Sequence, residues 1–337
     1  MFSAEVPPPL VARRLIPPND PRTGRPIDLN RVPDRPGRPV ETEDGLIWTT
    51  PVRTWTPRGM IALTIPNGQG VWVNLSRRWW GYGTDAGAGL LDAATGKTRV
   101  YPGVHSPVED SGTDERGVPV GLRESPGASY GRPCHGETSL KLPPDYVDSP
   151  VMYSSVLAAP KGSVIAGALT TGSAESPHTL PFVWANDEAK PRALPTPDGY
   201  DQAIVSALNS RGDVAGLIGG RGLPDRAVIW RADGTIARVP VGAWNVNRSP
   251  KAGPSSAAEP RLLTEDGVLI GRETSRDAPW GFVTTYWDGR RSLWFPDAVA
   301  GVRIVNLESL RLTADGWGFL AHVWDGKAWG WCRISPR

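Results

Sequence analysis

The chain has 337 residues, enough for one large domain or for two to three ordinary ones. It carries 37 Lys and Arg against 35 Asp and Glu, a net charge of +2 with both signs scattered along the chain. We therefore expect neither nucleic acid nor a membrane surface as a partner. Fifteen Trp indicate a sizeable buried core, although Gly and Pro together make up about a fifth of the residues.

The sequence also lacks the usual targeting and cofactor motifs. No apolar run approaches the roughly 20 residues of a membrane-spanning helix. Residues 1–15 have no basic segment followed by an apolar one, so we expect a cytoplasmic protein unless an export signal has been removed. Cys134 and Cys332 form no CxxC pair and no disulfide framework. The sequence predicts no metal site and no cofactor.

Residues 1–18 are rich in proline and are predicted to form an extended tail. A repeat follows, in which a polar residue precedes a glycine and a short apolar run, at Gly59, Gly117, Gly162, Gly212, Gly267 and Gly316. Between these glycines, short β-like runs end in proline at Pro102, Pro143, Pro195, Pro240 and Pro296. Other apolar runs end in tryptophan at Trp184, Trp230 and Trp287, whose repeated position indicates packing between blades.

One unit shows the pattern in full. Four strands are predicted within residues 202–240, and the last two are joined by an Asp-Gly turn over residues 231–234. The marker glycines are 45 to 58 residues apart, and no helical periodicity lies between them. All-β units of this length are typical of propeller blades, whereas a β-sandwich does not repeat one order of turns.

The two ends of the chain predict how the ring closes. The last unit stops after its third strand, "AWGWCRI", and residues 27–32 near the N-terminus have the form of a fourth strand ending at Pro33. We therefore predict one domain over residues 1–337, an all-β six-bladed β-propeller with four-stranded blades. An N-terminal strand would complete the last blade, a one-plus-three closure that removes an open sheet edge.

The stretch "AIVSALNSRGDVAGLIGG…RAVIW", Ala203 to Trp230, resembles the HAF-type repeats of bacterial proteins, in which an Asn-polar-Gly turn precedes a Val-x-Gly strand and a strand ending in Trp. The resemblance is strongest over residues 160–290. It implies a β-propeller and supplies no catalytic residues, because the repeat is defined by structural positions. Relatives of this kind are often exported.

In a propeller, ligands usually bind on the face formed by two kinds of connection, those from second to third strand and those from fourth strand to the next blade, and function is argued from residues there. The candidates for acid–base catalysis are three histidines and a carboxylate: His105, His135, His178 and Asp145. The candidates for ligand binding are aromatic and charged loop residues: Tyr146, Tyr200, Trp244, Arg221, Asp225, Arg276 and Trp280.

Two functions stay open on these residues. The first is a binding propeller that presents its aromatic and charged loops to a small molecule, a glycan or a protein. The alternative is a propeller enzyme of the lyase, cyclase or hydrolase type that uses His with Asp or Glu on the same face. HExxH, P-loop and EF-hand motifs are absent from the sequence, so none of these motifs decides between the two functions.

Overall fold

The structure is a computed structural model. It describes residues 10–15, 38–42, 45–50, 53–56, 59–61, 71–73, 79–84, 86–92, 95, 97–105, 113–123, 131–146, 154–159, 162–173, 176–239, 259–274, 282–287, 289, 292–294, 298–313, 316–327 and 329–336.

The described strands form seven antiparallel sheets, numbered here along the chain. The first sheet contains β2 (Arg38–Thr42), β3 (Gly45–Thr50), β4 (Arg53–Thr56) and β5 (Gly59–Ile61). The second contains β6 (Val71–Val73), β7 (Trp79–Thr84), β8 (Gly87–Asp92) and β9 (Thr98–Pro102). The third contains β10 (Val104–His105), β11 (Val120–Arg123), β12 (Arg132–His135) and β13 (Thr138–Ser139), followed by the 3-10 helix η2 (Pro144–Tyr146).

The fourth sheet contains β14 (Ser154–Ala158), β15 (Ile165–Ser173), β16 (Ser176–Trp184) and β17 (Arg192–Ala193). The fifth contains β18 (Gln202–Leu208), β19 (Val214–Gly220), β20 (Leu223–Trp230) and β21 (Ile236–Arg238). The sixth contains β22 (Glu259–Leu263), β23 (Leu269–Thr274), β24 (Phe282–Trp287) and β25 (Ser292–Trp294). The seventh contains β26 (Ala298–Val299), β27 (Val302–Thr313), β28 (Gly316–Trp324), β29 (Trp329–Pro336) and the N-terminal β1 (Leu10–Leu15).

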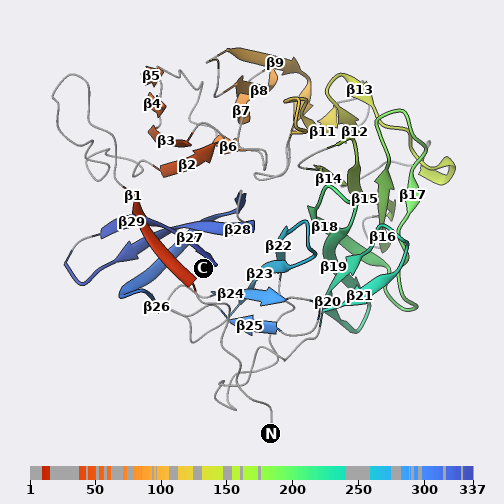
Figure 1. Ribbon diagram of the computed structural model, residues 1–337. Helices are drawn as coiled ribbons and strands as arrows, with labels where there is room; N and C mark the ends of the chain where they lie inside the picture. The colour runs from red at the N-terminus through yellow and green to blue at the C-terminus, as the bar shows by residue number, and fades with distance from the viewer. Residues whose placement is uncertain are drawn as a thin grey trace, which may run out of the picture.

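The sheets follow one another in chain order around a central region, with the first strand of a sheet such as β14 nearer the centre than its last strand, β17 (Figure 1). The predicted all-β class is confirmed. The four strands predicted within residues 202–240 are β18 to β21, so this unit is also confirmed. Among the described residues, no helix is long and apolar enough to cross a membrane.

The hydrophobic core lies between neighbouring sheets. One face of the fifth sheet packs on the fourth, in a cluster that joins Leu157 and Val183 to Val205 and Val228. Its other face packs on the sixth, where Ile229 contacts a cluster that includes Leu263 and Leu269. Because both faces of the sheet are buried, its strands are almost continuously apolar rather than alternating.

Tryptophans tie these interfaces together. Trp184 and Trp230 each end the third strand of a sheet, and both side chains are fully buried. The Trp184 indole N–H donates to the Lys141 carbonyl of the third sheet, at 2.8 Å, and that of Trp230 to the Pro195 carbonyl of the fourth, at 2.7 Å. Trp287 is also buried. The predicted packing role of these residues is confirmed.

The count of six blades is not confirmed, because the described strands form seven sheets. The glycine markers miscount at the N-terminal end for two reasons. Gly59 belongs to the fourth strand of its sheet, β5, and does not lie in the turn after the first strand. The segment between β6 and β7, residues 74–78, contains no glycine at all.

An N-terminal strand does pair with the last strand of the seventh sheet, but it is not the predicted one, and the sheet has five strands rather than the predicted one plus three. Strand β1 pairs with β29 from Leu10 opposite Pro336 to Leu15 opposite Trp331, within the segment predicted as an extended tail. Residues 27–32, which were expected in this place, lie outside the described residues. Strand β1 suits the position because Ala12 packs on the core cluster shared by the sixth and seventh sheets.

We expect Trp230→Ala to lower the free energy of unfolding by about 3–5 kcal/mol, since it removes a large buried side chain between two sheets. Trp230→Phe keeps an aromatic ring but loses the N–H donor to Pro195, and should cost less. Leu223→Ala serves as a control because Leu223 is 40% exposed. Urea unfolding monitored by circular dichroism measures all three, and an equal loss for Trp230→Ala and Leu223→Ala would contradict the packing role.

The docking of β1 has its own test. Ala12→Glu should lower the free energy of unfolding by about 1–3 kcal/mol, because a charge then faces the core. Arg13→Glu changes the neighbouring exposed position, which lies opposite Arg333 in the pair with β29. Since like charges opposite one another are unfavourable, Arg13→Glu should leave stability unchanged or slightly raised. Equal urea midpoints for the two variants would show that β1 does not dock as described.

Candidate functional site

Neighbouring strands are antiparallel, so the connections of the sheets fall at two ends. We call the end with the turns from first to second and from third to fourth strand the turn end. The other end, with the connections from second to third strand and from fourth strand to the next sheet, is the loop end. The sequence predicts ligand binding at the loop end.

The three candidate histidines do not share one end, and the expectation that they do was wrong. His178 pairs with Thr171 near the start of β16, at the loop end, and His105 pairs with Leu122 close to that end. His135 is the last residue of β12, the equivalent strand of the preceding sheet, and lies at the turn end. The residue pattern alone does not show that β12 crosses the sheet within residues 122–137 and carries His135 away from the loop end.

His135 is held between two carboxylates. Its Nε2 lies 3.1 Å from Asp114 Oδ2, and its Nδ1 lies 3.1 Å from Asp187 Oδ2. The His135 side chain is only 5% exposed and that of Asp114 4%, while Asp187 is 35% exposed. Asp114 belongs to the same sheet as His135, but Asp187 follows β16 in the fourth sheet. The histidine therefore bridges two sheets.

This arrangement does not leave the imidazole free for acid–base chemistry. A neutral imidazole has one N–H and one lone pair, and here both ring nitrogens already face a carboxylate. The neighbouring Cys134 is fully buried, and burial raises the pKa of its thiol to about 11, so it stays protonated at neutral pH. Neither residue is placed to attack or to bind a substrate at the surface.

Asp114 is stabilised as a carboxylate despite its burial. Burial raises the pKa of Asp114, but hydrogen bonds from His135, the Val118 N–H and Arg116 outweigh it, and the pKa lies below the ordinary 3.8. The Arg116 Nε donates at 2.9 Å to the oxygen that also faces His135. These contacts fix Asp114 at the turn between the first and second strands.

The same five-residue turn recurs at this position in three sheets, over residues 114–118, 209–213 and 264–268. In each, the N–H of the first residue donates to the carbonyl of the fifth, and the N–H of the fourth residue donates to the carbonyl of the first. The fourth residue is a glycine with a φ of +77°, +85° or +88° respectively, a conformation that costs glycine little. The first side chain, from Asp114, Asn209 or Thr264, accepts from the N–H of the fifth residue at 2.8, 3.0 and 2.9 Å.

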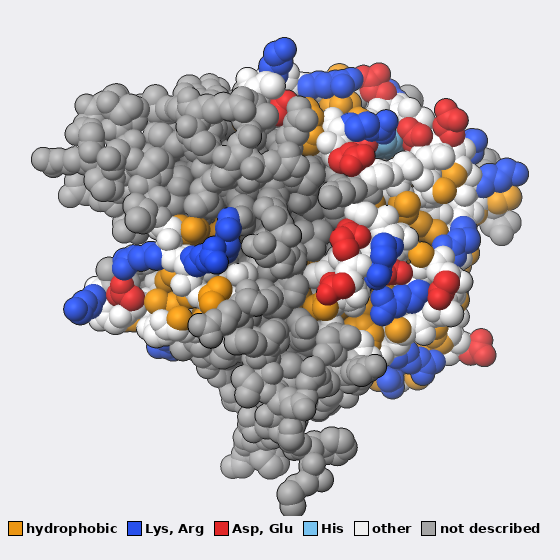
Figure 2. All heavy atoms as spheres, viewed as in Figure 1, with side chains coloured by type: hydrophobic (Ala, Val, Ile, Leu, Met, Phe, Trp, Pro, Cys, Tyr) orange, Lys and Arg blue, Asp and Glu red, His pale blue; other side chains and the backbone are white. Residues whose placement is uncertain are grey.

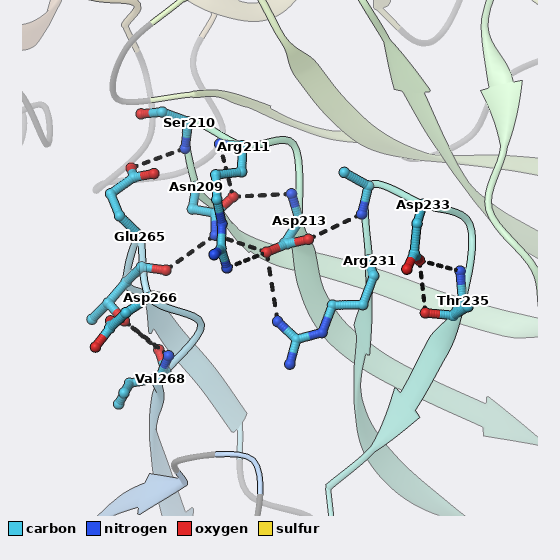
Figure 3. A network of polar contacts seen from close by, with 12 residues as sticks. Asn209, Ser210, Arg211, Asp213, Arg231, Asp233, Thr235, Glu265, Asp266 and Val268 are labelled. Carbon is cyan, nitrogen blue, oxygen red and sulfur yellow. Dashed lines mark hydrogen bonds and ion pairs between the residues drawn. The ribbon is translucent and has the colours of Figure 1, made fainter.

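In the fifth sheet this turn is also the contact with the sixth (Figure 3). The Asn209 side chain is fully buried, and its amide donates to Asp213 at 3.1 Å and to the Thr264 carbonyl of the next sheet at 3.0 Å. The N–H of Ser210 donates to the Glu265 carboxylate at 3.0 Å. Like His135, Asn209 therefore joins neighbouring sheets at the turn end.

At the loop end, the described candidates lie in connections of the fourth and fifth sheets. The Thr179 N–H, next to His178, donates to the Asp201 carbonyl at 3.0 Å, and Asp201 follows Tyr200. The Thr179 hydroxyl also donates to Gln202 Oε1 at 3.1 Å, which links the two sheets again. His178 is exposed, whereas Tyr200 is partly buried against the core.

The hairpin between β19 and β20 forms the other part of this loop end. Its residues Arg221 and Asp225 are exposed, and between them Leu223 is 40% exposed. A Cβ at Gly199 would lie 3.1 Å from Leu223 Cδ1, so the leucine covers the loop that leads to Tyr200. We call Tyr200, Arg221, Leu223 and Asp225 the hairpin surface. Sequence analysis missed Leu223, because it considered aromatic and charged loop residues as ligand contacts and passed over aliphatic ones.

The remaining candidates do not form a site in the described residues. Tyr146 is buried, and its ring packs edge-on against Phe182, with centroids 5.4 Å apart, so it belongs to the core between the third and fourth sheets. A ligand-binding role does not fit this burial. Trp244, Arg276 and Trp280 lie outside the described residues, as does the side chain of Asp145. Figure 2 shows charges of both signs mixed with small apolar areas over the described part of one face.

Comparisons with known proteins agree on the class. The structure is similar to prolyl oligopeptidase B from Galerina marginata, with 8% identity and a TM-score of 0.52, over 85% of this chain and 46% of that one. It is also similar to dipeptidyl peptidase 4 from Porphyromonas gingivalis, with 10% identity and a TM-score of 0.49, over 94% of this chain and 55% of that one. A third similar structure is the β-propeller domain of the Trilobed protease from Pyrococcus furiosus, with 10% identity and a TM-score of 0.44, over 86% of this chain and 92% of that one.

The chain thus spans about half the length of the two peptidases. At these identities the likeness bears on the fold alone. Together with the seven antiparallel sheets that follow one another around a centre, it supports a β-propeller. No protein family model and no curated protein sequence matches the chain.

The lowered pKa of Asp114 predicts that part of the protein's stability is lost in acid. Between its folded and its ordinary pKa the unfolded chain binds more protons, so the stabilisation by Asp114 is present above about pH 4 and is lost as the pH falls through the folded pKa. Asp114→Asn should therefore flatten the fall of the urea midpoint between about pH 5 and pH 3, while lowering stability at neutral pH. Glu137→Gln, an exposed change in the same sheet, controls for the loss of one surface charge. Equal slopes for the parent and Asp114→Asn would contradict the assignment.

Proposed function

We propose that this β-propeller is a binding protein and that the hairpin surface at its loop end is the centre of its ligand site. The observation that supports this is the exposed Leu223 between the exposed charges of Arg221 and Asp225. An apolar side chain surrounded by both signs of charge is the usual composition of a protein interface, with an apolar centre and a polar rim. Of the ligand classes considered from the sequence, this composition favours a protein or peptide over a small molecule or a glycan.

The geometry favours binding over catalysis for a specific reason. Among the described residues, His135 is the histidine with carboxylates in contact, and both of its ring nitrogens are engaged inside the protein. The exposed histidine, His178, lies beside the hairpin surface and supplies a polar, ionisable contact for a ligand there. We also propose that the seven sheets are seven blades of one ring and that the chain is related to the HAF-type repeat proteins. The five-residue glycine turn, repeated in three sheets, supports that relation.

The hairpin surface is tested by presenting the purified protein to a displayed random-peptide library and to a glycan array. We expect a peptide consensus that binds the parent. Leu223→Asp should weaken the binding of these peptides by about tenfold or more, because it removes an apolar anchor. Arg221→Glu should change which charged peptides bind, because charge complementarity selects partners.

Val100→Asp is the matched control, since Val100 is another exposed hydrophobic residue, 43% exposed, in the second sheet. It should bind as the parent does. Peptides that bind Leu223→Asp and the parent equally would contradict the proposed site. Binding confined to glycans would show that the ligand class is different.

A further inference from the structure

The bridge through His135 crosses the interface between the third and fourth sheets at the turn end. Asp114 and His135 belong to the third sheet, and Asp187 lies in the turn after β16 of the fourth sheet. Two further hydrogen bonds cross the same interface, from the Trp184 indole to the Lys141 carbonyl and from the Lys141 ammonium to the Glu188 carbonyl. The turn that carries Asp187 and Glu188 is therefore held by side chains of the neighbouring sheet.

The number of protons on His135 decides whether both carboxylate contacts can exist. An imidazolium has two N–H groups and donates to both aspartates. A neutral imidazole donates to one of them, and its remaining lone pair faces the other carboxylate at 3.1 Å, which is repulsive. Histidine is the side chain that ordinarily makes this change between about pH 5 and pH 8.

Several ionisable residues lie on the elements around the bridge. Among the described residues, Tyr101 and Arg116 interact with Asp114 through its charge. The neighbouring ionisable residues come from the turn before β11, from the β12–β13 hairpin and the segment after it, and from the turn after β16: Glu115, Glu137, Lys141 and Glu188. Arg116 is paired with Asp114 and also acts on Asp187 through its charge.

The two ends of the bridge differ in how firmly they are held. Asp114 is 4% exposed and accepts from the N–H groups of Arg116 and Val118 as well as from the Arg116 side chain. Asp187 is 35% exposed, so its carboxylate is able to turn into water. When one contact is lost, the remaining proton stays with the buried Asp114, because a buried carboxylate loses more without its donor.

We propose that Asp114, His135 and Asp187 form a proton-controlled latch between the third and fourth sheets. With two protons on His135 the latch is closed and the turn over residues 185–190 is fixed to the neighbouring sheet. With one proton the contact to Asp187 opens and the part of the turn around Asp187 loosens, while the Lys141 ammonium still holds the Glu188 carbonyl. This turn lies at the end opposite the hairpin surface, so the latch does not depend on the proposed ligand site.

Hydrogen–deuterium exchange, corrected for the intrinsic pH dependence of exchange, tests the latch on the full chain. In the parent, the amides of residues 185–190 should exchange about five- to tenfold faster at pH 8 than at pH 5, since the turn loses one of the charged hydrogen bonds that hold it. In Asp187→Asn this step, the rise in exchange rate between pH 5 and pH 8, should disappear. An asparagine amide accepts from an N–H or donates to a lone pair, so it contacts His135 at either pH.

His135→Gln should also show no step, and Asp187→Asn keeps the test available if His135→Gln fails to fold, because position 187 is partly exposed. His178→Gln, which removes an exposed histidine from the same sheet as the turn, should keep the step of the parent. Nitrogen chemical shifts of the His135 ring should change over the same pH range as the exchange. A parent without the step, or a step that persists in Asp187→Asn, would overturn the proposal.

Discussion

The third to sixth sheets of this protein each contribute to an apolar cluster on both of their faces, and much of the described structure follows from that constraint. A sheet in such a position has no solvent face on which to place its polar residues, so these gather at the strand ends. The apolar clusters between the fourth, fifth and sixth sheets illustrate this. The turns are then the places where neighbouring sheets exchange hydrogen bonds, and the buried Asn209 and His135 are both found there.

Sequence reasoning succeeded where local chemistry decides the structure. The unit over residues 202–240 was predicted strand by strand. A glycine turn and an Asp-Gly turn set where its strands begin and end, and the short apolar segments between the turns favour strands. The number of sheets was missed for an equally local reason. "TEDGLIW", Thr42 to Trp48, repeats "TEDGVLI", Thr264 to Ile270, and marks the first turn of the first sheet, whereas the glycine chosen was Gly59. The second sheet carries no such marker.

The site was harder to predict than the fold because its contacts cross between sheets. Asp114, His135 and Asp187 are far apart in the sequence and share no pattern, and only the packing of one sheet on the next brings them together. From the sequence, His135 and His178 are equivalent candidates at the loop end. A difference of a few residues in where a strand begins places them at opposite ends of equivalent strands. The sequence also did not reveal that the Tyr146 side chain is buried, because its polar neighbours suggested an exposed loop.

The repeated turn has a consequence for how the sheets find their order. Its internal hydrogen bonds need only one oxygen on the first side chain, and Asp114, Asn209 and Thr264 all supply it. What each offers outward is different: a carboxylate for a histidine, or an amide for a carbonyl. The first residue of the turn can therefore differ from one interface between sheets to the next without disturbing the turn itself. Sheets of similar topology thereby acquire distinct partners, which disfavours their docking in the wrong order as the chain folds.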